Sequence, residues 1–273
     1  MQNRQKFHQV CQIAASMFCT RFVTSLICTS LITISVGCMA EEEVRVERIE
    51  KLRAIGVISN PVVLTAPNPG SSATVELTAY AGLPAGSSIT ATSFLDEGSA
   101  YAPPMPVVMD PTTAVTQSFA ALDLYSVKGT ATIGPLSPAQ QALLASPSGK
   151  LTLRYGIRLE SGEESEDIVG NILVYPNGSD EAAYQALGVN VAEPVANSTV
   201  GLTSDQILSG TITKPQPENV KVSWFVSSGK VTNRRAKETK WAPEKTGPQT
   251  VIMTARGMKS GSFAVQAVDV NVE

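Results

Sequence analysis

The segment 220–226 reads VKVSWFV and decides the fold of the C-terminal part of the chain. Apolar residues alternate with polar ones, and successive side chains of a strand point to opposite faces, so Val220, Val222 and Trp224 share one face. Strict alternation of this kind is typical of antiparallel sheets that bury one face and expose the other. We therefore expect Trp224 to lie in the core of a β-sandwich.

The residues after this segment predict further strands that complete such a sandwich. Ser227-Ser228-Gly229 has the composition of a turn. Strand-like stretches follow at 230–231, 239–243, 250–256 and 263–272. In the last of these the apolar phase shifts, from Phe263 and Val265 to Val268, Val270 and Val272, and this shift predicts a β-bulge near Ala267.

The order of these elements resembles the PKD-like and bacterial Ig-like modules of secreted surface proteins. The resemblance covers about 55 residues near the C-terminus and rests on Trp224 in a central strand, on Gly229-Lys230-Val231 and on Thr239-Lys240-Trp241-Ala242-Pro243. It implies an Ig-like fold. It says little about function, because such modules serve as adhesion domains, spacers and appendages of enzymes.

The first half of the chain is also rich in strand patterns. Residues 74–80 and 151–159 alternate with period two, and 161–164 reads as a turn into a returning strand at 168–175. One short helix is expected where Ser137 can cap and Pro138 can occupy the first helical position. The predicted fold is thus all-β, with tandem Ig-like antiparallel β-sandwiches and one short helix in the first.

Two short similar stretches mark where the predicted domains begin. Ala54-Ile55-Gly56-Val57 precedes a proline, and so does Ala186-Leu187-Gly188-Val189. With loop-like residues at 176–180 between them, we expect a first domain at 54–178 and a second at 183–273.

Charge differs between the two predicted halves. Residues 54–182 hold four Lys and Arg against 12 Asp and Glu, a net charge of −8, whereas residues 183–273 hold ten against seven, a net charge of +3. A molecule with this polarity is suited to stack head to tail with itself, or to offer unlike faces to a partner.

The N-terminus has the features of an export signal. Residues 1–21 carry basic residues and no acid, and the apolar run 22–36 is too short for a comfortable membrane span. Ser35-Val36-Gly37-Cys38 resembles a bacterial lipobox, which implies a signal peptide at 1–37 and lipidation of Cys38. Ser35 departs from the Leu that is usual there, and Cys38-Met39-Ala40 can also be read as a cleavage site that releases a soluble periplasmic or secreted protein.

If Cys38 is acylated, residues 38–53 form a tether between lipid and folded protein. The charged stretch 41–53 is expected to be a solvated spacer, or else a short helical or extended segment. The residue after Cys38 is Met39, where the lipoprotein family uses Asp to retain its members at the inner membrane. The resemblance thus implies a membrane partner, and a location at the outer membrane or cell surface.

The mature chain has little of the usual chemistry of active sites. The single histidine, His8, and the cysteines Cys11, Cys19, Cys28 and Cys38 all lie within the first 38 residues. Without them the mature chain has no Ser-His-Asp or Cys-His nucleophile system, no thiolate or imidazole metal site and no disulfide framework. No cofactor and no metal are expected.

Two clusters of carboxylates are candidates for a metal site or an acid pair. One comprises Glu160, Glu163, Glu164, Glu166 and Asp167, and the other is Asp96-Glu97. Their spacing lacks the order of an EF-hand loop, so a solvated acidic hairpin tip is preferred over a Ca²⁺ site. Nothing in the sequence places them in a cleft as a glycosidase pair would require.

A basic stretch in the second half is the candidate binding surface. It comprises Lys230, Arg234, Arg235, Lys237, Lys240 and the neighbouring Trp241. These residues suit an anionic envelope polymer, lipid headgroups or the acidic first domain of a neighbouring molecule, and Trp241 could stack on a sugar. The alternative is a solvated strand face with a buried Trp241. The acidic pI of about 5.4 and the lack of interleaved aromatics argue against nucleic acid.

From the sequence we expect a non-enzymatic envelope lipoprotein whose Ig-like domains act in adhesion, assembly or spacing. A glycan- or peptidoglycan-binding accessory protein is the alternative, and a secreted enzyme without His or Cys chemistry is the third possibility.

Overall fold

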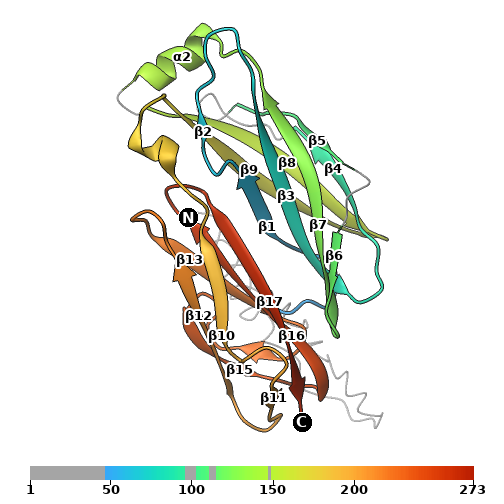
Figure 1. Cartoon of the computed structure of the whole chain (residues 1–273). Coiled ribbons are helices and arrows are strands. Elements are labelled where there is room, and N and C mark those ends of the chain that lie inside the picture. Colours follow the sequence, from blue (N-terminus) through green and yellow to red (C-terminus); the bar gives the residue numbers. More distant parts are fainter. Residues whose placement is uncertain (1–46, 96–102, 111–114, 147–148) are drawn as a thin grey trace, which may run out of the picture. The chain divides into compact units, whose positions relative to one another are not determined.

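The computed structural model describes residues 47–95, 103–110, 115–146 and 149–273 (Figure 1). Its fold is all-β, with two β-sandwiches in tandem, as predicted from the strand patterns.

In the residues that the structure describes, the first sandwich comprises nine strands and one α-helix. They are β1 (Arg53–Asn60), β2 (Leu64–Thr65), β3 (Ala73–Pro84), β4 (Thr90–Phe94), β5 (Val107–Met109), β6 (Val115–Ser118), β7 (Leu122–Ile133), α2 (Pro138–Ala145), β8 (Leu151–Ser161) and β9 (Glu164–Tyr175). One sheet has the order β1-β3-β7-β5, with β6 also on β7, and the other has the order β2-β9-β8-β4. The predicted alternation holds, because Val75 and Leu77 of β3 and Leu151 and Ile157 of β8 all face one core.

A short 3₁₀ helix, η1 (Asp180–Ala183), precedes the second sandwich, which contains eight strands. They are β10 (Gly188–Glu193), β11 (Thr199–Val200), β12 (Gln206–Thr213), β13 (Val220–Val226), β14 (Lys230–Val231), β15 (Glu238–Ala242), β16 (Gly247–Gly257) and β17 (Phe263–Val272). Its sheets have the orders β10-β12-β15-β14 and β11-β17-β16-β13.

Both sandwiches share the immunoglobulin strand plan. If strands are lettered along each sandwich, one sheet is A-B-E-D and the other contains C, F and G, which is the Ig arrangement. In each, the first strand is followed by a cis X-Pro bond, at Pro61 and Pro194, and then by a two-residue strand that pairs in parallel with the last strand. The weak sequence repeat thus marks equivalent positions of two Ig-like folds.

The predicted helix is present as α2. Ser137 Oγ accepts a hydrogen bond from Gln140 N at 3.3 Å, and Gln140 Oε1 accepts one from Ser137 N at 2.9 Å, which together form a capping box. Leu144 is buried in the core of the first sandwich and attaches the helix to it.

Trp224 and Trp241 fill the core of the second sandwich from opposite sheets. Both side chains are 0% exposed and belong to the same apolar cluster. Each indole N–H has a backbone acceptor: Trp224 Nε1 donates to Ala236 O at 2.9 Å, and Trp241 Nε1 donates to Ser228 O at 2.8 Å. Because these donors are satisfied, burial of the rings carries no hydrogen-bonding penalty.

The bulge predicted near Ala267 is absent. Strand β17 pairs with β16 in unbroken register from Phe263 to Val272. The apolar phase shifts because β17 has two buried faces: Val268 and Val270 point into the core of the second sandwich, whereas Phe263 belongs to a separate apolar cluster that includes residues of the first sandwich.

The prediction of a solvated spacer is wrong for the described part of the tether. Ile49 and Leu52 are only 3% and 1% exposed. Ile49 N donates to Val226 O at 3.0 Å, and Val226 N donates to Glu47 O at 2.9 Å, so this stretch lies along the edge of β13. The reason is that its two apolar side chains find buried positions, Leu52 in the first core and Ile49 between the sandwiches. Residues 38–46 lie outside the described part.

Candidate functional site

The outer face of β13, β16 and β17 forms the second sandwich's side of the contact between the sandwiches. Strand register arranges it in three cross-strand rows. They are Phe225-Ile252-Ala267, Ser223-Thr254-Val265 and Lys221-Arg256-Phe263. The face is therefore apolar at the first row and cationic at the third.

Residues of the first sandwich cover the apolar end of this face. Ile49, Ile55, Leu122 and Leu124 pack with Phe225, Ile252 and Phe263, and we call these seven residues the junction cluster. All of them are at most 8% exposed. A polar contact adds to it, because Asp269 Oδ2 accepts a hydrogen bond from Ala120 N at 3.0 Å. The two sandwiches are thus joined by a small core of their own.

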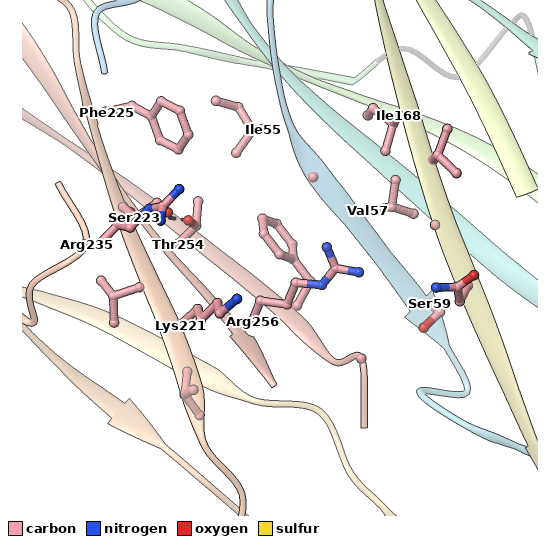
Figure 2. A pocket seen from close by; sticks show the side chains of 18 of the residues that line it. Ile55, Val57, Ser59, Ile168, Lys221, Ser223, Phe225, Arg235, Thr254 and Arg256 are labelled. Carbon is pink, nitrogen blue, oxygen red and sulfur yellow. Dashed lines mark hydrogen bonds between the residues drawn. The ribbon is translucent and has the colours of Figure 1, made fainter. Parts of the chain in front are cut away.

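A cleft of about 440 Å³ opens beside the junction cluster and is the candidate site (Figure 2). The first sandwich lines it with the apolar Ile55 and Val57 of β1 and Ile168 and Val169 of β9, and also with the polar Ser59, Asn171 and Tyr155. The second sandwich lines it with three basic residues, Lys221, Arg235 and Arg256. We call it the cationic cleft, because its lining includes these three basic residues and no Asp or Glu.

The cations come from different elements. Lys221 and Arg256 are direct cross-strand neighbours on β13 and β16, and Arg235 lies in the loop between β14 and β15. Figure 2 shows Arg256 extending from its strand towards Val57 and Ser59 of β1, across the cleft. A second hollow of about 220 Å³ shares Lys221 and Arg256 with the cleft and adds Lys259.

Tyr155 is one of the residues that line the cleft, and it is 5% exposed. Burial raises the pKa of Tyr155 to about 12, and the opposing effect of Arg256 does not cancel this. The side chain is therefore a neutral phenol at any physiological pH, able to donate a hydrogen bond.

The structure separates the residues of the predicted basic surface. Arg235 alone among them lines the cationic cleft. Lys230 and Lys240 are exposed on β14 and β15 of the other sheet, and Lys240 Nζ is 3.6 Å from Asp205 Oδ2. Arg234 and Lys237 lie in the loop between those strands.

Trp241 does not belong to a binding surface, because its ring is fully buried. It sits on the inward phase of β15, opposite Val231 in the register, so no aromatic platform for a sugar is present at this position. The reading of Trp241 as a binding residue is therefore wrong, whereas the reading as a core residue agrees with its burial.

The acidic hairpin is partly a structural joint of the first sandwich. Glu164 Oε2 accepts a hydrogen bond from Leu52 N at 2.7 Å, and Glu166 Oε2 accepts one from Ala54 N at 2.6 Å. Asp167 forms two hydrogen bonds with Arg158, at 2.7 and 2.8 Å, and these bonds and the positive charge hold the pKa of Asp167 below its usual value. Glu160 and Glu163 remain at the exposed tip. Asp96-Glu97 lies outside the described residues.

Glu218 is a buried carboxylate that the sequence did not single out. It is 7% exposed and accepts hydrogen bonds from Gln216 Nε2, Ser260 Oγ, Ser260 N and Lys259 N, at 2.8 to 3.0 Å. Burial by itself would raise the pKa of Glu218, but these hydrogen bonds outweigh burial and lower it. Its role is to fix the turn between β16 and β17, which borders the second hollow.

Other predicted features fall beyond what the structure describes. The signal peptide at 1–37 and the lipidation site Cys38 are outside the described residues.

The residues that the structure describes contain no group of three or more acidic side chains that could hold a metal ion. No helix within the same residues has the length and apolar character to cross a membrane.

Comparisons with known proteins agree with the fold and add nothing on function. No protein-family model matches the chain, and no curated protein matches it. Solved structures with similarity include the fibronectin(III)-like modules of Clostridium thermocellum CbhA, at 12% identity and a TM-score of 0.30, over 81% of this chain and 94% of that one. The N-terminal Ig1-2 module of the Drosophila receptor protein tyrosine phosphatase DLAR matches at 7% identity and a TM-score of 0.27, over 82% of this chain and all of that one. These scores are too low to carry an argument, so the assignment to tandem Ig-like sandwiches rests on the strand order.

Proposed function

We propose that this protein is an exported, non-enzymatic module of the cell envelope, anchored through lipid on Cys38, that holds or spaces a partner through its tandem Ig-like domains. The junction cluster carries this proposal. Two Ig-like folds joined by a short linker alone would move independently, because interfaces between domains are usually small and polar. Here seven apolar side chains are buried between them.

The burial is large enough to matter for stiffness. Each large apolar side chain that is fully buried stabilises by about 1.5–3 kcal/mol. Three such residues on the second sandwich therefore contribute several kcal/mol, which opposes opening of the junction. A spacer or adhesion module benefits from this stiffness, since a partner held at its far end stays at a fixed distance.

The path of the chain before β1 supports anchoring at the junction. Glu47 and Ile49 hydrogen-bond to Val226 of the second sandwich, whereas Leu52 is buried in the first. A pull exerted through residues 38–46 would therefore act on both sandwiches at once. Those nine residues would span about 30 Å if fully extended, which leaves room for lipid headgroups below the folded protein.

The two alternatives have less support. A glycan-binding role was expected to use Trp241, and Trp241 is buried. An enzymatic role would need a gathered acid–base pair, and the lining of the cationic cleft includes no carboxylate.

The test of the anchor is metabolic labelling of the full-length chain with palmitate in a bacterial host. Wild type and Cys28→Ser should both take up label and fractionate with membranes, because Cys28 lies within the signal. Cys38→Ser should lose the label and give unprocessed precursor or soluble protein. Equal labelling of Cys38→Ser and Cys28→Ser would end the proposal of a lipid anchor.

A further inference from the structure

The cationic cleft has an arrangement of charge that is unfavourable without a counter-ion. Lys221 and Arg256 face each other directly across β13 and β16. Like charges at directly opposed positions of an antiparallel pair destabilise the sheet. Arg235 adds a third positive charge to the same lining. No ion pair in the described residues offsets this repulsion.

These cations have no ion-pair partner in the described part of the chain. No ion pair is formed there by Lys221, Arg235 or Arg256, and the lining of the cleft includes no carboxylate. Some other basic residues of the protein do find partners. Lys128 Nζ is 3.0 Å from Glu76, and Lys240 Nζ is 3.6 Å from Asp205. Lys221, Arg235 and Arg256 are therefore three cations that line one hollow without an ion pair in the described part of the chain.

The wall opposite the cations is mainly apolar, with Ser59, Asn171 and Tyr155 as its polar members. Ile55, Val57 and Ile168 line it, and Val169 is 39% exposed beside them. The volume of about 440 Å³ lies within the range of sites for small molecules. Such a hollow gives an amphipathic ligand a place for both of its parts.

We propose that the cationic cleft binds a small amphipathic oxyanion, a carboxylate or phosphate monoester carried on an apolar body. The oxyanion accepts hydrogen bonds from Lys221 and Arg256. Arg235, in the loop between β14 and β15, adds a third positive charge that attracts it. Charge-assisted hydrogen bonds of this type are the stronger ones in proteins, and the guanidinium group of arginine suits a planar or tetrahedral oxyanion. The apolar body lies against the β1 and β9 wall.

Tyr155 supports this assignment in a secondary way. Burial raises the pKa of Tyr155 to about 12, so this residue of the lining is neutral at physiological pH and does not repel an anion. The site belongs to the junction of the sandwiches, and the proposal does not depend on whether Cys38 is acylated.

Isothermal titration of residues 39–273 with n-octyl phosphate tests the proposal. These residues include all those that the structure describes. We expect one ligand per chain, and binding weakened about tenfold or more by Lys221→Gln or Arg256→Gln. Lys230→Gln and Lys237→Gln are the matched controls, because both remove a positive charge from the same domain outside the cleft, and they should bind as wild type does. Equal affinity in Arg256→Gln and Lys237→Gln would overturn the proposal.

Four further titrants, octanoate, octanol, inorganic phosphate and an acidic peptide, show which part of the ligand is recognised and from which class it comes. Octanoate in place of octyl phosphate tells whether a carboxylate is accepted, and binding of either one supports the class. Octanol lacks the charge, and inorganic phosphate lacks the apolar body, so each should bind much more weakly. If octanol binds with the same affinity as octyl phosphate, the assignment is contradicted. It is also contradicted if an acidic peptide binds and neither octyl phosphate nor octanoate does.

Amide chemical shifts give a readout that does not need a variant. Titration with octyl phosphate should move the signals of Gly56, Gly170 and Gly261, which line the cleft, and leave Gly134 unchanged. Shifts confined to other parts of the protein would place the ligand elsewhere and reject the site.

Discussion

The ring of Phe263 in β17 lies directly on the backbone of Gly56 in β1, so that a Cβ atom added to Gly56 would overlap it. These two residues belong to different sandwiches. The absence of a side chain at Gly56 lets a strand of the first sandwich approach an aromatic residue of the second more closely than any other residue would allow. Phe263 is also the neighbour of Arg256 in its cross-strand row, so the junction cluster and the cationic cleft are built on the same strands.

Replacing Trp224 by Ala should destabilise the second sandwich strongly. A large aromatic side chain removed from a packed core usually costs about 3–5 kcal/mol, and a domain of this size has about 5–15 kcal/mol to lose. Both Trp rings are 0% exposed and both donate to a backbone carbonyl. We therefore expect Trp224→Ala and Trp241→Ala to be comparably severe in urea unfolding followed by circular dichroism.

Conservative variants provide the control. Trp224→Phe and Trp241→Phe keep most of the apolar volume and lose the indole donor, so each should lose less stability than its Ala variant. If Trp224→Ala melts within a degree or two of wild type, the ring is not in the core.

Glu218 should make the second sandwich sensitive to acid. Its pKa is lowered in the folded protein, so its stabilising contribution is fully present above the unfolded pKa of about 4.3. The contribution is lost as pH falls through the lower folded pKa, because the unfolded state then binds the proton first. Glu218→Gln should lower the free energy of unfolding by about 1–3 kcal/mol at pH 7. The difference from wild type should shrink below about pH 4.3, as measured by urea unfolding at several pH values.

Asp167→Asn is the matched control for Glu218→Gln. The pKa of Asp167 is also lowered, yet its partner Arg158 is exposed and the pair is open to solvent. Exposed ion pairs contribute little to stability. An effect of Asp167→Asn at pH 7 as large as that of Glu218→Gln would contradict the role given to the buried carboxylate.

Zinc and copper should not stabilise the part of the chain after Cys38. That part includes no His and no Cys, and a ligand raises the melting temperature only if it binds the native state. Equimolar Zn²⁺ or Cu²⁺ should therefore leave the melting temperature unchanged in differential scanning fluorimetry. An increase that a chelator reverses would reveal a site made of oxygen ligands.

Much of the fold follows from local patterns. Alternation at 220–226 placed Trp224 in the core, and Ser137 with Pro138 fixed the start of the helix, because both signals act over a few residues of the chain. The shared Ala-x-Gly-Val stretches correctly marked equivalent strands of two Ig-like folds.

The junction and the cleft could not be derived in the same way. Phe225 lies on the opposite face of its strand from Trp224, and the alternation of apolar residues shifts within 263–272. These two features are the signs of a second apolar face that the sequence contains. The shift was interpreted as a bulge because a sequence shows which side chains share a face and not what covers it. Arg235 and Arg256 are likewise brought together only by the contact between strands and loops far apart in the chain.

The central claim is that the junction cluster holds the two sandwiches together as one unit. A distance measurement between two spin labels by pulsed electron paramagnetic resonance tests it. Spin labels on Val108→Cys and Ile207→Cys report from exposed positions in each sandwich, 76% and 49% exposed, in a chain of residues 39–273 that has no other thiol. Wild type and the control Gly134→Val, where an added Cβ meets nothing within 4 Å, should give one narrow distance distribution. Gly56→Val should displace Phe263 and give a broad distribution. A narrow distribution that Gly56→Val leaves unchanged, or a broad one already in wild type, would contradict the claim.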